Sequence, residues 1–215
     1  GKLRSDHRHL DLGGFILYYA GQPLLIDCGR LDYTQSDASV YGYSASSHNT
    51  LLINGLSAEV DGPSWLQEAY KRVRVKTKLT ESEDSVMFTI NHDGFDRISN
   101  RTVAHERRFK LKSDMFEIED RLLGHGACDL GLSFHYSPEF GPPDSQGSEF
   151  SFKNIGATFH VDNRFTGRVL SGQSESPISG LFSTEYGVIA NCFTLDIHET
   201  IHLPAIIKNR VSFNA

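Results

Sequence analysis

The stretch VAHERRFKL, residues 103–111, decides the fold class because two kinds of position alternate along it. Val103 and Phe109 fall on one parity, and Glu106 and Lys110 fall on the other. Successive side chains of a β-strand point to opposite faces of the sheet. The alternation therefore predicts a strand with one buried face and one solvated face.

The same two-residue period recurs along the rest of the chain. Residues 73–79 and 116–119 repeat it, and Gly- and Pro-containing turn signals separate the runs. Further strands are expected at residues 13–19, 24–27, 50–53, 85–90, 130–136, 157–161, 167–170 and 188–195. Residues 64–70 could form a short helix, and residues 141–147 form the most loop-like stretch. Many short antiparallel strands with regular turns predict an all-β fold, an antiparallel β-sandwich.

The length of 215 residues suits one large domain, and the sequence shows no internal repeat, low-complexity tract or clear linker. We therefore expect residues 1–215 to form a single β-sandwich domain. The chain begins without Met and in the middle of a motif. It is therefore expected to be a fragment of a larger protein.

Charge and cysteine content restrict the function further. A net charge of −6 disfavours general binding to nucleic acid, although a local group of Arg and His could still bind an acidic ligand. The longest apolar stretch, residues 13–20, is too short to cross a bilayer. Cys28, Cys128 and Cys192 are widely spaced without a CxxC pair, so buried thiols are expected rather than a Cys-type zinc site. The oligomeric state cannot be inferred.

Two cationic side chains, His105 and Arg107, lie on the apolar parity of their strand. Such groups are seldom buried without partners. They therefore indicate either a satisfied polar network inside the protein, the favoured alternative, or a face that opens onto a groove. The Arg and Lys side chains at positions 72, 74, 76 and 78 are more typical of a solvated face than of a polyanion track.

Three side chains in the first 50 residues, His9, Asp27 and His48, could bind a metal ion. Two His nitrogens and one carboxylate form a common ligand set for zinc, with water as the fourth ligand. A simple hairpin would keep His9 far from Asp27, roughly 23 Å away at strand rise. The chain must therefore bend back, and Gly13-Gly14 is the expected place because Gly tolerates unusual dihedral angles.

Other polar residues flank this set. If residues 5–11 are extended, His7 and His9 point the same way, so one could bind metal while the other faces a substrate. Asp11 could orient a His ring or simply form a turn. The loop between the second and third candidate ligands carries three tyrosines, which could stack on sugars, donate protons or only pack the loop: Tyr33, Tyr41 and Tyr43.

The order of these motifs resembles the C-terminal β-sandwich module of heparinase II/III-type polysaccharide lyases, including related alginate lyases. The matching segments are HRHLD at 7–11, GF at 14–15, LLIDCG at 24–29 and SHNT at 47–50. Weaker matches are HERR at 105–108, DRL at 120–122, FH at 134–135 and GLFSTEYG at 180–187. One departure is Cys28, where the family usually has Pro.

The resemblance implies roles for the candidate residues. His9, Asp27 and His48 would hold a zinc ion that is mainly structural. His7 would face the substrate cleft and take part in catalysis, and a loop tyrosine would approach the substrate. Tyr33 is the preferred tyrosine, with the other two left open.

It also implies what the chain acts on and what it lacks. The substrate would be an acidic, uronic-acid-containing polysaccharide, glycosaminoglycan-like or alginate-like, cleaved by β-elimination in the periplasm or outside a bacterial cell. Family members carry an N-terminal helical domain, an α/α-toroid, that completes the active site. We therefore expect this chain alone to be inactive.

Two other functions remain open at the level of sequence. The chain could be a noncatalytic carbohydrate-binding or scaffolding module. It could also be a separate metal-binding sandwich of the cupin type, which the missing second half of a cupin ligand set disfavours.

Overall fold

The computed structural model describes residues 9–31, 34, 36–60, 73–97, 103–185 and 187–214. The helix expected at residues 64–70 lies outside them. Within them, all but one of the longer elements are strands. These are β1 (Leu17–Tyr19), β2 (Gln22–Leu25), β3 (Leu51–Ile53), β4 (Val75–Glu81), β5 (Val86–His92), β6 (Ala104–Leu111), β7 (Met115–Tyr136), β8 (Asp144–Gln146), β9 (Glu149–Phe152), β10 (Ala157–His160), β11 (Gly167–Ser171), β12 (Leu181–Glu185), β13 (Val188–Asn191) and β14 (Phe193–Phe213).

One α-helix and three short 3₁₀ turns complete the described elements: α1 (Asp37–Tyr43), η1 (Ala45–Ser47), η2 (Pro138–Phe140) and η3 (Lys153–Ile155). Helix α1 begins at the N-cap Ser36, whose side chain accepts a hydrogen bond from the backbone N–H of Ser39. Together, α1 and η1 carry the chain from β2 toward β3. No described helix is both long and apolar enough to cross a membrane.

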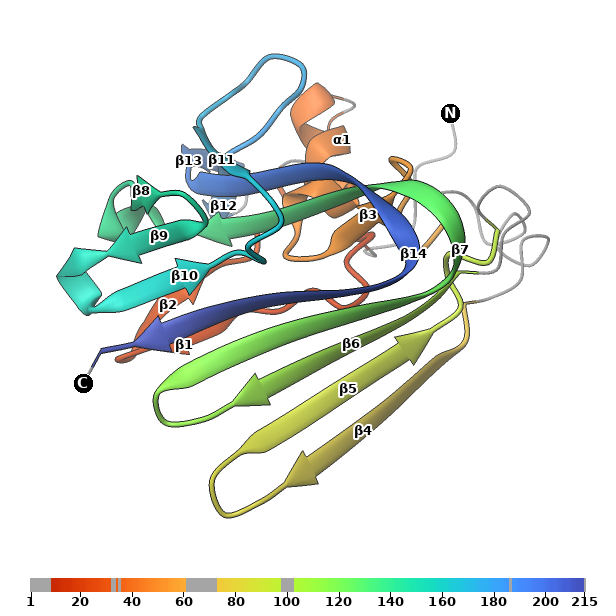
Figure 1. The fold of residues 1–215 in the computed structure, drawn as a ribbon. Helices are drawn as coiled ribbons and strands as arrows, with labels where there is room; N and C mark the ends of the chain where they lie inside the picture. Colours follow the sequence, from red (N-terminus) through yellow and green to blue (C-terminus); the bar gives the residue numbers. More distant parts are fainter. Residues whose placement is uncertain are drawn as a thin grey trace.

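The two longest strands, β7 and β14, pair with each other along most of their length and join the layers of the fold (Figure 1). Halfway along, the register shifts between Leu203 and Ala205, opposite a segment of β7 that contains Gly124 and Gly126. Both glycines have positive φ, which other residues rarely adopt. The bulge and the glycines allow both strands to curve, so each contributes one half to each layer.

Each half of the β7–β14 pair has its own neighbours. In the first layer, β4, β5 and β6 lie beside β7, whereas β10, β9 and β8 lie beside β14. In the second layer, β2 and β3 pair with the C-terminal half of β7, and β11 pairs with the N-terminal half of β14. Strands β12 and β13 form a separate two-stranded sheet. The expected antiparallel β-sandwich is confirmed.

Aromatic side chains fill the space between the layers. Phe134 and Tyr136, from the end of β7, pack on Phe159 and Phe152 from β10 and β9, each with a ring pair 4.7 Å apart. All four rings are buried. Each such ring contributes a large apolar area, so truncation to Ala would cost about 3–5 kcal/mol. This packing fixes the end of β7 from which His135 projects.

Several expectations need correction. Residues 141–147, expected to be a loop, contain β8, and α1 forms where the loop tyrosines were placed. Strand β12 and most of β14 were not expected. The β4 strand is exposed on both faces within the described residues, although the alternation predicted one buried face. It is the edge strand of its layer, so only β5 covers it laterally.

Candidate metal centre

The structure brings together the three residues proposed as metal ligands. One ligand atom from each of His9, Asp27 and His48 lies within 4.8 Å of the other two, and we call these residues the histidine cluster. Asp27 follows the end of β2, and His48 follows η1. The expected bend is present: Gly13 has φ 79°, and the Gly14 N–H donates to the Asp11 carbonyl at 2.6 Å.

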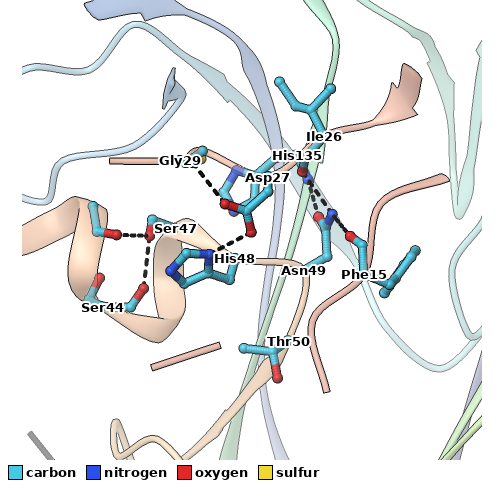
Figure 2. Close-up of polar contacts among 12 residues, drawn as sticks. Phe15, Ile26, Asp27, Gly29, Ser44, Ser47, His48, Asn49, Thr50 and His135 are labelled. Carbon is cyan, nitrogen blue, oxygen red and sulfur yellow. Dashed lines mark hydrogen bonds and ion pairs between the residues drawn. The ribbon is translucent and has the colours of Figure 1, made fainter. Parts of the chain in front are cut away.

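The contacts within the histidine cluster suit a metal site (Figure 2). His48 Nδ1 lies 2.7 Å from Asp27 Oδ2, and the Gly29 N–H donates to Asp27 Oδ1 at 2.8 Å. His48 is fully buried, and its Nε2 has no hydrogen-bond partner among the described residues. A buried ring nitrogen without a partner is costly unless something else binds the cluster.

The charges of the histidine cluster favour cation binding. Burial raises the pKa of Asp27, but the hydrogen bond and the charge of His48 outweigh burial and hold this pKa below its usual range. Burial, followed by the charge of His48, lowers the pKa of His9. The carboxylate is therefore ionised and the His9 ring neutral near pH 7, which are the forms that bind metal ions.

Asn49 connects the histidine cluster to three parts of the fold (Figure 2). Its amide nitrogen donates to the carbonyls of Phe15 and Ile26 at 2.7 and 2.8 Å, and its Oδ1 accepts from the His135 N–H at 2.7 Å. These bonds fix Ile26, which precedes Asp27, relative to Asn49, which follows His48. The SHNT motif contains Asn49, but only the tertiary structure reveals its partners.

A buried ionic network supports this end of the sandwich. Asp120 accepts hydrogen bonds from Arg107 Nε at 2.7 Å and Nη2 at 3.0 Å, and it lies 2.7 Å from His105 Nε2. Arg107 Nη1 donates to the carbonyls of Gly13 and Asn49 at 2.9 and 2.8 Å. His105 and Arg107 thus form the favoured satisfied network rather than a groove. Arg107 holds both the glycine bend and the backbone beside His48.

A second group of possible ligands, Cys28, His135 and Cys192, was missed from the sequence. One ligand atom from each lies within 4.8 Å of the others, and all three residues are buried. We call this group the thiol cluster. The absence of a CxxC pair was a misleading signal, because β-sheet pairing assembles residues that are distant in sequence.

The surroundings of Cys28 and Cys192 shift the pKa values of the two thiols in opposite directions. Burial, followed by the neighbouring Cys192, raises the pKa of Cys28. The Cys28 thiol and nearby His135 lower the pKa of Cys192 to about 6 despite its burial. The buried Tyr41 hydroxyl lies 3.8 Å from Cys28 Sγ, so Tyr41 contacts the thiol cluster.

The remaining candidate residues fall in different places. Tyr43 lies beside the histidine cluster, with its ring 5.2 Å from that of His9 and below the Arg30 guanidinium at 4.5 Å. His7 and Tyr33, the predicted catalytic residues, lie outside the described residues. Among the described loop tyrosines, only Tyr43 therefore contacts the predicted metal ligands directly.

The sequence matches the family described as Heparinase II/III-like, C-terminal, over residues 1–205. The chain belongs to this family. A search of curated proteins gave no match. The match to the family over residues 1–205 confirms the resemblance inferred from the motifs.

Solved heparinase structures share the fold. Heparan sulfate lyase HepC from Pedobacter heparinus superposes with a TM-score of 0.73 at 15% identity, covering 97% of this chain and 31% of that one. A heparinase III gene product gives a TM-score of 0.70 at 13% identity, covering 96% and 30%. A further heparinase III gives 0.60 at 17% identity, covering 95% and 29%. The chain thus spans less than a third of the length of these structures.

Proposed function

We propose that this chain is the β-sandwich domain of a polysaccharide lyase that cleaves a uronic-acid-containing polysaccharide by β-elimination. The observation that carries the proposal is the histidine cluster, in which three potential ligands from separate segments meet in a chain of this family. The similarity in fold to heparan sulfate lyase HepC agrees with an acidic polysaccharide as substrate.

The histidine cluster fits a zinc ion. Two ring nitrogens and one carboxylate oxygen match a common zinc donor set, and a bound ion could use the buried His48 Nε2, which has no partner among the described residues. When bound, zinc would supply a positive charge and a rigid link between the segments that carry its ligands. Its role in the proposal is structural.

The chemistry defines what the protein residues must do. The C5 proton of a uronate is weakly acidic, so the adjacent carboxylate must be neutralised by hydrogen bonds or positive charge. A base then removes the proton, and an acid protonates the departing O4. His7 would neutralise the carboxylate or transfer a proton, because a His side chain can do either near neutral pH.

The position of His7 in the chain suits this role. It precedes His9 by two residues, so fixing His9 in the histidine cluster would restrict where His7 can reach. Tyr33 would approach the substrate from the loop that follows Asp27. Tyr43 is the alternative tyrosine, because its ring already lies against His9.

The proposal includes a second domain. The chain covers less than a third of the solved lyases that share its fold. We propose that an N-terminal helical domain of the same protein completes the site and that the chain alone is inactive. The full-length protein would act in the periplasm or outside the cell.

Metal analysis of the purified chain tests the zinc proposal. His9→Ala and His48→Ala should each remove one equivalent of zinc relative to the wild type. The matched control is His198→Ala, because the His198 side chain is 63% exposed and lies 3.0 Å from Asp196, outside both clusters. Unchanged zinc content in both cluster variants would contradict the proposal.

Activity of the full-length parent protein tests the lyase proposal. Release of unsaturated uronate from heparan sulfate or alginate should fall about 10²–10⁴-fold in His7→Ala, as expected for loss of an acid–base group. Binding of the polysaccharide without any unsaturated product from the wild-type parent would instead indicate a noncatalytic carbohydrate-binding module.

A further inference from the structure

We propose that Cys28, His135 and Cys192 form a second metal site, a buried thiolate site that takes Zn²⁺. This site shares no ligand with the histidine cluster and does not depend on the proposed lyase activity. It would brace the segment after β2 against β7 and the residue between β13 and β14.

Three separately anchored segments supply its donors. Cys28 follows β2, His135 lies near the end of β7, and Cys192 lies between β13 and β14. The Cys28 carbonyl accepts the Ser183 N–H at 2.9 Å, and the Cys192 N–H donates to the Gly180 carbonyl at 2.8 Å. The His135 N–H is held by Asn49 Oδ1 at 2.7 Å. The backbone therefore fixes all three donors before any metal binds.

The His135 ring is oriented as a ligand. Its Nδ1 lies 2.9 Å from Thr194 Oγ1, and this contact fixes the ring plane. Its Nε2 is buried and has no hydrogen-bond partner in the described part of the chain. One nitrogen of the His135 ring lies within 4.8 Å of both sulfurs, and the buried Nε2 is costly to leave without a partner.

The charge and the chemical softness of the three donor groups favour zinc as the bound ion. Thiolate and imidazole donors suit Zn²⁺, and two protein thiolates neutralise its double charge. A site that is neutral overall avoids the cost of burying a net charge, and each of the three residues is completely buried. The Tyr41 hydroxyl, 3.8 Å from Cys28 Sγ, can donate a hydrogen bond to the thiolate.

Cobalt binding distinguishes the two clusters. Co²⁺ replaces Zn²⁺ and gives a thiolate-to-metal charge-transfer absorption only where sulfur is a ligand. The metal-free chain, kept reduced with a phosphine, would be titrated with Co²⁺ and then with Zn²⁺. The band should appear in the wild type and in His48→Ala, be lost in Cys28→Ser and Cys192→Ser, and decrease on displacement by Zn²⁺.

A matched control and a variant-free measurement complete the test. Cys128→Ser should keep the band, because Cys128 is also buried but belongs to a different part of β7. In the wild type, Zn²⁺ should protect Cys28 and Cys192, but not Cys128, from alkylation in mild denaturant, as mapped by mass spectrometry. This readout holds even if a serine variant fails to fold.

Two results would overturn the proposal. One is no charge-transfer band and no zinc-dependent protection in the reduced wild type. The other is a band that persists in both Cys28→Ser and Cys192→Ser. A Cys28–Cys192 disulfide in the purified protein, with no metal bound after its reduction, would assign the pair to disulfide formation instead.

Discussion

The histidine cluster and the thiol cluster each take one ligand from two consecutive residues, Asp27 and Cys28, yet the clusters differ in donor atoms and in exposure. The histidine cluster has nitrogen and oxygen donors, and the side chain of Asp27 is 29% exposed. The thiol cluster has two sulfurs and one nitrogen, and it is completely buried. One short segment thus contributes Asp27 to a partly exposed site with nitrogen and oxygen donors. It contributes the next residue, Cys28, to a buried site with sulfur donors.

In the proposed roles of the two clusters, this difference would separate two tasks. A site that holds residues near a substrate must reach the surface, whereas a site that braces the fold can be enclosed. Both clusters depend on Asn49, which follows His48 directly and binds the backbone of His135. A substitution of a residue that supports both clusters should therefore weaken metal binding at both. A substitution of a ligand in one cluster should weaken metal binding at that cluster alone.

The largest effect is expected from Arg107→Met, which removes the side chain that holds the backbone carbonyls of Gly13 and Asn49. Arg107 is fully buried, so its loss leaves the Asp120 carboxylate without its main cationic partner. We expect the free energy of unfolding to fall by about 3–5 kcal/mol in urea denaturation. Arg108→Met, on the opposite face of β6, is the control and should cost less than about 1 kcal/mol. Equal losses in the two variants would contradict this interpretation.

Acid should weaken the same buried network, because His92 Nε2 lies 2.8 Å from His105 Nδ1. Burial, followed by the charges of His105 and Arg107, lowers the pKa of His92 from 6.5 to about 3. Between these two values the unfolded chain binds a proton that the folded chain does not, so stability falls as the pH drops. The loss should reach up to about 4 kcal/mol over this window.

Urea unfolding from pH 7 to pH 3 measures this dependence. His92→Phe should flatten the curve, whereas His198→Phe, at an exposed position, should leave it unchanged. A wild-type curve that is flat between pH 6 and pH 4 would rule out a buried neutral His92.

Asn49→Ala tests whether the two clusters are coupled. The variant leaves two carbonyls and one N–H without their partner, so we expect a loss of about 2–3 kcal/mol in unfolding free energy. Zinc affinity should fall at both clusters, as measured by competition with a chelator. Asn163→Ala, at an exposed position, should change neither quantity. Loss of affinity at the histidine cluster alone would show that the clusters are independent.

The smallest effect should come from Thr194→Val, which concerns the thiol cluster alone. Thr194 orients the His135 ring through its hydroxyl, so the variant should lower zinc affinity there about tenfold, or about 1.4 kcal/mol. Thr194→Ser keeps a hydroxyl and should restore most of the affinity. The histidine cluster should keep its affinity in both variants, and a change there would contradict the separation of the two sites.

Much of this fold and one of its sites could be predicted from the sequence. Two-residue alternation located β6 and the start of β7 because one face of each meets the core. The spaced motifs around His9, Asp27 and His48 identified a ligand set that the structure gathers within 4.8 Å. These signals are local, since each lies within a few residues or belongs to a motif with a recognisable family pattern.

Other features depend on contacts between distant segments. Pro204 interrupts β14, so local pattern gave no reason to extend this strand through the bulge to Phe213. The exposure of β4 follows from its place at the sheet edge, which alternation cannot report. Asn49 and Arg107 bind backbone groups of distant residues, and any residue type can provide those groups.

The sequence alone therefore predicted the fold class, many of the strands, the family and the three residues of the histidine cluster, because side-chain periodicity and motif order can be read along the chain. Only the tertiary structure decided that Cys28, His135 and Cys192 meet. Their proximity arises from antiparallel pairing of β7 with β14 and from the docking of the segment after β2 against β12. Sheet pairing joins residues at any separation in sequence, so spacing between cysteines cannot reveal such a site.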